Sequence, residues 1–359
     1  MTSLHHRATN RRAVLAAGVG LAATFVPAAA AEPARIVAEE HWAQKGNVKL
    51  YLYRKRVVND GVAAEDHWAQ KGNVRLYLYR KRVVDDGVAG KPVLFLVHGS
   101  SFSGRGGFDL QVPGHPDYSF MDAFARFGFD VWTLDHENYG RSTRNTGSNS
   151  DIMSGVADLE AAMPVVERVT GQKRFRVKGQ SSGAIRAGVF TMRNPDRVER
   201  LILDAFTWTG EGAPEIMRRR TQVESYKASP NRKMDRAAFV AIFSRDDPST
   251  FEAAVPQALA DYELAFGDTA PSGTYLDMAI HMPMVDPARI PCPVLMHRAE
   301  SDGNATDAEL LEFFGKLPNR DKQFAMLRGV AHVAVLGTNR KRVWHVMREF
   351  LTLPDMVRG

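Results

Sequence analysis

The stretch "VKGQSSGAIRAG", from Val177 to Gly188, places a serine between two glycines. Its first three residues end the segment "RFRVKG", which is typical of a strand, and its last five begin "AIRAGVFTMRN", which is typical of a helix. Gly179 and Gly183 allow a strand to turn sharply into a helix without a Cβ clash, and such a turn exposes the central side chain at the helix N-terminus. The pattern predicts that Ser181 is a nucleophile.

A serine hydroxyl needs a base that takes its proton, a carboxylate that orients the base, and N–H donors for the oxyanion. At this point the sequence resembles the α/β-hydrolase fold family, from Glu65 to Leu351. The motifs that carry the resemblance occur in the family's order: "HG" at His98-Gly99, "DHENYGRS", the serine turn, "ESD" and "GVAH". The resemblance implies a mostly parallel sheet with helices on both faces and a nucleophile, acid and base in that order along the chain.

The resemblance also implies roles for particular residues. Downstream of Ser181 the histidines are His281, His297, His332 and His345. His332 alone follows a strand end in a loop, where the family has its base, so we expect it to accept the proton. Asp302 in "VLMHRAESDG" is the expected acid, although Ala299 replaces the glycine that the family commonly has there. Glu300 and Asp204 remain alternative acids.

The family's oxyanion hole implies two backbone N–H donors here, from Ser100 and Ser182. The glycine-rich "GSSFSGRGG" lacks the ending of a P-loop, and no dinucleotide fingerprint is present. His136 and Glu137 are adjacent rather than helically spaced, so they do not form a zinc-binding helix motif. The chemistry therefore requires no cofactor and no metal.

Strand-like and helix-like stretches alternate along most of the chain, which predicts a parallel α/β sheet. We assign residues 64–206 and 291–359 to this core and 207–290 to a helical cap insertion. The core includes a helix in "SDIMSGVADLEAAMPVVERVTG" with Ser150 as its cap and Gly171 as its stop. Most aromatic side chains of the insertion are expected to pack within it, whereas Trp208, directly after a strand, is expected to face a substrate pocket.

Residues Ala38–Ala63 are repeated almost unchanged as Ala64–Ala89, with differences only at Glu40/Asp66, Lys49/Arg75 and Asn59/Asp85. Each copy contains a strand of alternating pattern. Two copies are too few for a solenoid. The second copy supplies the strands that precede the hydrolase core, and the first, within residues 32–63, is surplus and either mobile or added to the sheet edge.

The first 31 residues have a basic start, an apolar Ala/Val/Leu stretch and a small-residue ending, which together are typical of a signal peptide. The paired Arg11-Arg12 resembles a twin-arginine signal. We therefore expect a periplasmic or secreted protein that begins near Glu32, with a retained membrane anchor as the alternative. The single cysteine, Cys292, cannot form an internal disulfide and is expected to be buried.

The formal net charge is +6, but no basic helix with interleaved aromatics is present, so nucleic acid is not an expected partner. The sequence predicts an exported serine hydrolase that cleaves a small-molecule carboxylic ester or lactone through an acyl-enzyme on Ser181. An amidase, an acyltransferase, a carbon–carbon bond hydrolase or a non-catalytic binding protein of the same fold are the alternatives.

Overall fold

A ten-stranded sheet runs through the part of the chain that the computed structural model describes, residues 35–45, 48–58, 61–83 and 90–357. Its strand order is β1-β2-β3-β4-β6-β5-β7-β8-β11-β12. The strands from β6 to β12 in this order are all parallel to their neighbours, whereas β1 to β4 and the β4–β6 pair are antiparallel. The predicted α/β-hydrolase architecture, a mostly parallel sheet with helices, is confirmed.

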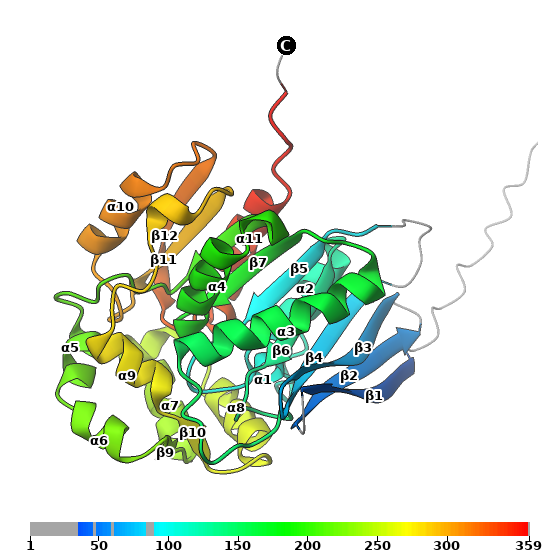
Figure 1. Cartoon of the computed structure of the whole chain (residues 1–359), viewed down its shortest axis with the longest axis horizontal. Coiled ribbons are helices and arrows are strands. Elements are labelled where there is room, and N and C mark those ends of the chain that lie inside the picture. The colour runs from blue at the N-terminus through cyan, green and yellow to red at the C-terminus, as the bar shows by residue number, and fades with distance from the viewer. Residues whose placement is uncertain (1–34, 46–47, 59–60, 84–89, 358–359) are drawn as a thin grey trace, which may run out of the picture. The chain divides into compact units, whose positions relative to one another are not determined.

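The strands of this sheet are β1 (Arg35–Lys45), β2 (Val48–Val58), β3 (Val62–Lys71), β4 (Val74–Val83), β5 (Val93–Val97), β6 (Asp130–Asp135), β7 (Phe175–Gln180), β8 (Val198–Asp204), β11 (Val294–Ser301) and β12 (Lys322–Ala331). The helices of the core are α1 (Gly104–Phe108), α2 (Phe120–Arg126), α3 (Ile152–Thr170), α4 (Ser182–Arg193), α10 (Asp307–Lys316) and α11 (Arg340–Leu351). Figure 1 shows how these elements are arranged.

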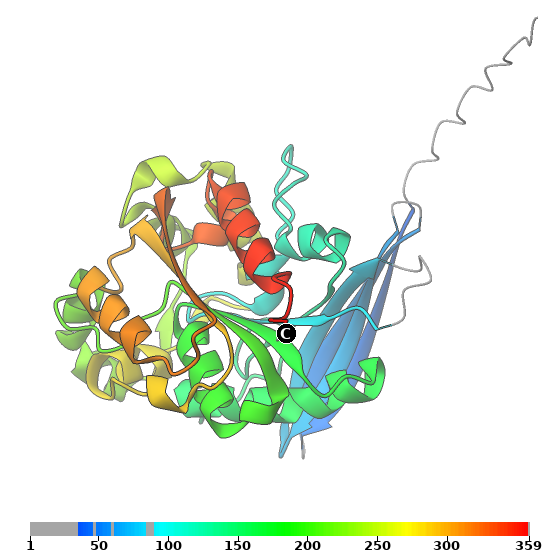
Figure 2. The same cartoon turned by 90° about the horizontal axis from the view of Figure 1, so that it is seen from above.

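Helices cover both faces of the sheet. Figure 2, a view along the sheet, shows α3 and α4 on one face and α2 and α11 on the other. The two ends of α3 show how a capping side chain and a glycine determine where such a helix begins and ends. Asp151 rather than Ser150 is the cap, because its carboxylate accepts a hydrogen bond from the Ser154 N–H, so the prediction for Ser150 is wrong. Gly171 ends the helix as predicted, in the left-handed region with a φ of 73°.

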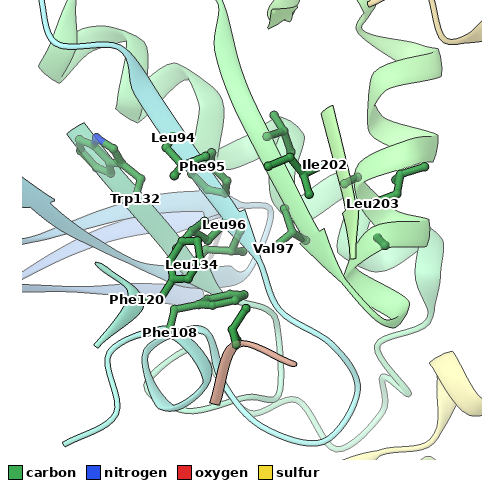
Figure 3. Close-up of a cluster of buried hydrophobic side chains, with 14 of the residues drawn as sticks. Leu94, Phe95, Leu96, Val97, Phe108, Phe120, Trp132, Leu134, Ile202 and Leu203 are labelled. Atoms are coloured by element: carbon green, nitrogen blue, oxygen red, sulfur yellow. The ribbon is translucent and has the colours of Figure 1, made fainter. Parts of the chain in front are cut away.

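The core of the sheet is apolar on both sides of its central strands. All five residues of β5 are buried, as expected for a parallel strand covered on both faces. Side chains of β5, β6 and β8 meet those of the covering helices in the cluster drawn in Figure 3, whose labelled residues are Leu94, Phe95, Leu96, Val97, Phe108, Phe120, Trp132, Leu134, Ile202 and Leu203. This packing fixes the strand ends from which the loops of the site emerge.

The two copies of the repeat form two successive antiparallel hairpins, β1–β2 and β3–β4. The hairpins share one register, since Ala38 pairs with Lys55 in the first and Ala64 pairs with Lys81 in the second. β2 pairs with β3, so the first hairpin extends the edge of the sheet. Of the two expectations for the first copy, the structure has the added edge (Figure 1). The second copy is the one that joins the core, because β4 pairs with β6.

Deleting Ala38–Ala63 is expected to leave a folded and active protein. The deletion joins Val37 to Ala64, so Ile36 and Val37 take the positions of Val62 and Ala63 in β3, and the β4–β6 pairing is untouched. Thermal unfolding and hydrolysis rates of the shortened and full chains make the comparison. Removing both copies, Ala38–Ala89, is the contrasting control and should prevent folding because it removes β4. Loss of a folded enzyme in the single deletion would show that the first hairpin is structural.

Between β8 and β11, residues 207–290 form a mainly helical cap. It contains α5 (Pro214–Arg220), α6 (Val223–Ala228), α7 (Arg236–Ser244), α8 (Ala254–Leu264), α9 (Gly273–Ile280) and a small sheet of β9 (Asn231–Lys233) and β10 (Thr269–Pro271). β11 then pairs with β8, so the chain returns to the same sheet after the cap. Among the residues that the structure describes, no helix combines the length and the apolar character needed to cross a bilayer. The predicted signal, residues 1–31, lies outside the described residues.

Candidate active site

Ser181 lies at the turn between β7 and α4, where its backbone adopts a φ of 57° and a ψ of −127°. A positive φ is costly for a residue with a side chain, and such strain is characteristic of functional turns. The Ser181 N–H donates to the Asp204 carbonyl of β8 at 2.9 Å, which ties the turn to the neighbouring strand. The two glycines are needed because a Cβ at Gly179 would overlap the Gly183 carbonyl, and one at Gly183 would overlap the Val97 carbonyl.

Gly183→Ala should therefore lower the free energy of unfolding by about 1–3 kcal/mol, since the added methyl group meets backbone that cannot rotate away. Gly315→Ala is the matched control. Gly315 lies in the last turn of α10, and no atom beyond its chain neighbours and the helix backbone is within 4 Å of an added Cβ, so alanine should not destabilise the protein there. Denaturant unfolding of both variants measures the difference. Equal stabilities would show that the turn accommodates a side chain.

A hydrogen-bonded chain joins Ser181 to His332 and His332 to Asp302. His332 Nε2 is 3.0 Å from Ser181 Oγ, and His332 Nδ1 is 2.9 Å from Asp302 Oδ1. An ionised carboxylate only accepts, so Nδ1 carries the hydrogen and Nε2 is free to accept from the serine hydroxyl. Three loops that follow β7, β11 and β12 supply these side chains, and parallel strands bring such loops to one edge of the sheet.

The environment of Asp302 keeps its carboxylate ionised. Burial alone would raise the pKa of Asp302, but the charge and hydrogen bond of His332, the Asn304 amide and the Arg245 guanidinium together hold it well below its usual value. The Asn304 N–H donates to Asp302 Oδ1 at 2.9 Å. Asp302 is therefore an acceptor at neutral pH, which suits a group that holds an imidazole in one tautomer.

The two alternative acids lie elsewhere. Glu300 is half-exposed, and its carboxylate accepts from the Gly329 N–H at 2.8 Å. Asp204 is fully buried and pairs with Lys178 at 2.8 Å and with His297 Nδ1 at 2.7 Å. Neither carboxylate contacts His332 in the described structure, so Asp302 is the one that the fold brings to the imidazole.

The two amides expected to bind an oxyanion lie beside Ser181. Ser100 and Ser182 are buried, and their hydroxyls are 2.7 Å apart, which holds the two loops together. Within the described residues neither amide nitrogen donates to a protein acceptor, so both N–H groups are available. His98 stabilises this loop, because its ring accepts from the His136 N–H at 2.9 Å and its other nitrogen is 2.8 Å from the Gly99 carbonyl.

A small pocket opens at Ser181 between the core and the cap. Its lining residues are Gly99, Ser100, Ser101, Phe102, Gln180, Ser181, Arg219, Ile242, Arg245, Tyr275, His332 and Val333. Trp208 is not among them, which corrects the expectation that it faces the substrate. Its indole N–H donates to the Val285 carbonyl at 3.0 Å, and its ring packs against Phe313, so it lines a separate pocket with Pro283 and Lys316.

Sequence reasoning missed the polar residues that the cap and the acid loop contribute. Tyr275, an aromatic residue of the cap, lines the pocket, as do Arg219 and Arg245. Asn304 Nδ2 is 3.2 Å from His332 Nε2, so its amide shares the imidazole with the Ser181 hydroxyl. A weak signal existed for Arg219, because it lies three residues after Ile216 in α5 and so shares the buried face of the helix.

Comparisons with known proteins agree with this fold. A family model described as "Serine aminopeptidase, S33" matches residues 117–337. A 2-hydroxy-6-oxononadienedioate/2-hydroxy-6-oxononatrienedioate hydrolase of Paraburkholderia phymatum is 32% identical over 116 residues, which is 32% of this chain and 36% of that protein. The match thus spans about a third of the curated relative's length.

Solved structures of low sequence identity share the architecture. The enol-lactonase from Burkholderia xenovorans LB400 has a TM-score of 0.56 at 17% identity, covering 80% of this chain and 100% of that one. E-2-(acetamidomethylene)succinate hydrolase has a TM-score of 0.56 at 18% identity, covering 80% and 98%. The fold and the comparisons define an α/β-hydrolase enzyme. The chain belongs to the S33 serine aminopeptidase family of hydrolases.

Proposed function

We propose that this chain is an exported serine hydrolase that cleaves a carboxylic ester or lactone through an acyl-enzyme on Ser181. The observation that supports it best is the hydrogen-bonded chain of Ser181, His332 and Asp302 at one pocket. Apart from the water that hydrolyses the acyl-enzyme, this chemistry uses only side chains and backbone amides of the chain.

In the first half-reaction Ser181 Oγ attacks the scissile carbonyl carbon while His332 Nε2 takes the hydroxyl proton. Asp302 keeps its hydrogen bond to Nδ1 and stabilises the imidazolium. The tetrahedral oxyanion accepts hydrogen bonds from the Ser100 and Ser182 amides. The bond to the leaving oxygen then breaks, His332 returns its proton to that oxygen, and the acyl group stays on Ser181.

In the second half-reaction a water molecule loses its proton to His332 Nε2 and attacks the acyl carbon. Collapse of the second tetrahedral species releases the carboxylic acid, and the proton returns to Ser181 Oγ. A lactone follows the same steps, except that the leaving hydroxyl remains attached to the acyl group. An amine acceptor or an amide substrate would use the same residues, so substrate choice depends on the pocket.

A fluorophosphonate probe tests the proposal most directly. It should label the wild-type protein at Ser181, with the modified peptide identified by mass spectrometry. A panel of aryl esters of different acyl length, lactones and amides then identifies the bond that is cleaved. An unlabelled protein that hydrolyses none of them would favour the non-catalytic binding protein instead.

Export by the twin-arginine route is part of the proposal and rests on residues 1–31. Replacing both Arg11 and Arg12 with lysine should move the protein from the periplasmic or secreted fraction to the cytoplasm, because the paired arginines are the recognised feature. Fractionation of an expressing bacterium with immunodetection measures this. The same distribution for the wild type and the double-lysine variant would contradict it.

A further inference from the structure

The pocket at Ser181 continues into a larger cavity under the cap. This outer cavity has a volume of about 580 Å³ and shares Ser101, Ile242, Arg245 and Tyr275 with the inner pocket. Most of its remaining lining residues belong to α5, α6, β9 and α7. Figure 1 shows where these cap elements lie. A substrate that reaches Ser181 from the cap side therefore passes the side chains of these elements.

The walls of the two cavities carry an excess of positive charge. Their cationic side chains are Arg218, Arg219, Arg232, Lys233 and Arg245, whereas Glu215 is the acidic residue among the described lining. Glu215 is already engaged, at 2.6 Å from Arg218 and 3.4 Å from Arg245. Arg245 also pairs with Asp246, which lies outside the lining, at 3.2 Å. Arg219, Arg232 and Lys233 form no ion pair among the described residues, so the path to Ser181 has a positive potential.

Arg219 is the most deeply placed of these cations. It is 1% exposed, and among the described residues its guanidinium forms no ion pair and its Nε no hydrogen bond. Its nitrogen contacts are to neutral acceptors, Met278 Sδ at 3.4 Å and Asn304 Oδ1 at 3.5 Å, and it lies over the Tyr275 ring at 4.4 Å. A buried charge without a counterion is costly, and a bound anion would offset that cost.

Arg232 and Tyr275 extend the positive region to the oxyanion loop. Arg232 lies over the Tyr275 ring at 4.1 Å and donates to Ser101 Oγ at 3.0 Å. Burial alone would raise the pKa of Tyr275, yet Arg232, Arg219 and Arg245 lower it to about 7. The positive charge of three guanidinium groups thus acts on the phenol of Tyr275, which lines the same pocket as Ser181.

We propose that Arg219, with Arg245, Arg232 and Tyr275 around it, forms a carboxylate-binding subsite, so that the substrate carries an anionic carboxylate close to its scissile carbonyl. This inference rests on the proposed function for its substrate class. Arginine presents paired N–H donors that match a carboxylate. The subsite adjoins the reacting groups, because Arg245 donates to Asn304 Oδ1 at 3.1 Å and Asn304 contacts His332.

Paired aryl esters test the subsite. The mono-aryl ester of glutaric acid and the aryl ester of pentanoic acid have acyl chains of equal length and differ in the terminal carboxylate. A second pair carries the carboxylate on the leaving phenol. The wild type should have the higher kcat/KM for the anionic member of at least one pair. Arg219→Gln should lower the ratio of anionic to neutral kcat/KM by about 10- to 100-fold, the range expected for a lost charge-assisted hydrogen bond.

Arg220→Gln is the matched control. Arg220 is the next residue of α5, pairs with Glu211 at 2.7 Å and lines neither cavity, so the ratio should stay that of the wild type. A ratio is used because a general loss of activity cancels from it. Calorimetric titration with glutarate supplies a readout without catalysis: the wild type should bind it, and Arg219→Gln should bind it at least about 10-fold more weakly.

The outcomes separate this inference from the proposed function. A protein that is labelled at Ser181, prefers neither anionic ester and does not bind glutarate would overturn the subsite and leave the serine hydrolase intact. A protein that binds glutarate through Arg219 but is neither labelled nor active would keep the subsite and refute the hydrolase. If Arg219→Gln does not fold, the wild-type ratios and the glutarate titration still decide.

Discussion

Ser181→Ala is expected to lower kcat for the best ester or lactone by about 10⁶-fold, the loss that follows removal of the nucleophile from a serine–histidine pair in other hydrolases. The reason is geometric. Ser181 Oγ is the hydroxyl 3.0 Å from His332 Nε2, and its strained turn points it into the pocket. Steady-state kinetics measure the loss, and the fluorophosphonate label should disappear with it.

Two comparisons make the Ser181→Ala result specific. Thermal unfolding of the variant should match the wild type, because the change removes one oxygen at a partly exposed position. Ser182→Ala keeps the amide and the Ser181–His332 contact but removes the hydroxyl contact with Ser100, so it should lower kcat far less than Ser181→Ala does. A Ser181→Ala protein that retains turnover and label would place the nucleophile elsewhere and refute the proposed mechanism.

Asp302→Asn is expected to lower kcat by about 10⁴-fold, the size of the effect when an amide replaces the acid of such a chain. An asparagine can present its NH₂ group to His332 Nδ1, and this favours the tautomer with hydrogen on Nε2. That tautomer cannot accept the Ser181 proton. Kinetics at neutral pH, together with thermal unfolding, distinguish lost catalysis from lost folding.

The rival acids are the controls for Asp302→Asn. Glu300→Gln should keep nearly all activity, because the half-exposed Glu300 carboxylate contacts the Gly329 amide and Arg328 rather than His332. Asp204→Asn should lower stability by about 3–5 kcal/mol, since it leaves the buried Lys178 charge without its partner, while the protein that remains folded stays active. A loss of 10⁴-fold in Glu300→Gln instead would reverse the assignment.

Much of the core could be predicted because its signals are local. The apolar run of β5 and the strand-to-helix turn at Ser181 each follow from neighbouring residues. The limits of α3 show where such signals become ambiguous. Ser150 and Asp151 are both residue types that favour the helix N-cap. Asp151 is the cap because its carboxylate, rather than the Ser150 hydroxyl, accepts the hydrogen bond from the Ser154 N–H. The repeat could also be recognised in the sequence. Whether its first copy joins the sheet, however, depends on the pairing of β2 with the edge strand β3.

The features of the site can also be separated into those that the sequence predicts and those that only the tertiary structure shows. The sequence by itself determined that Ser181 stands at a tight turn between two glycines, and the need for glycine at Gly179 is local because a Cβ there would overlap the Gly183 carbonyl. At Gly183 the need for glycine arises from the tertiary structure, because a Cβ there would overlap the Val97 carbonyl of β5. Only the tertiary structure decided which carboxylate meets His332, how Trp208 turns away, and that Arg219, Arg232 and Arg245 surround Tyr275. The physical reason is sequence separation. Turn and helix-cap preferences depend on residues that are neighbours in the chain, whereas these ion pairs and hydrogen bonds join side chains that meet only after folding.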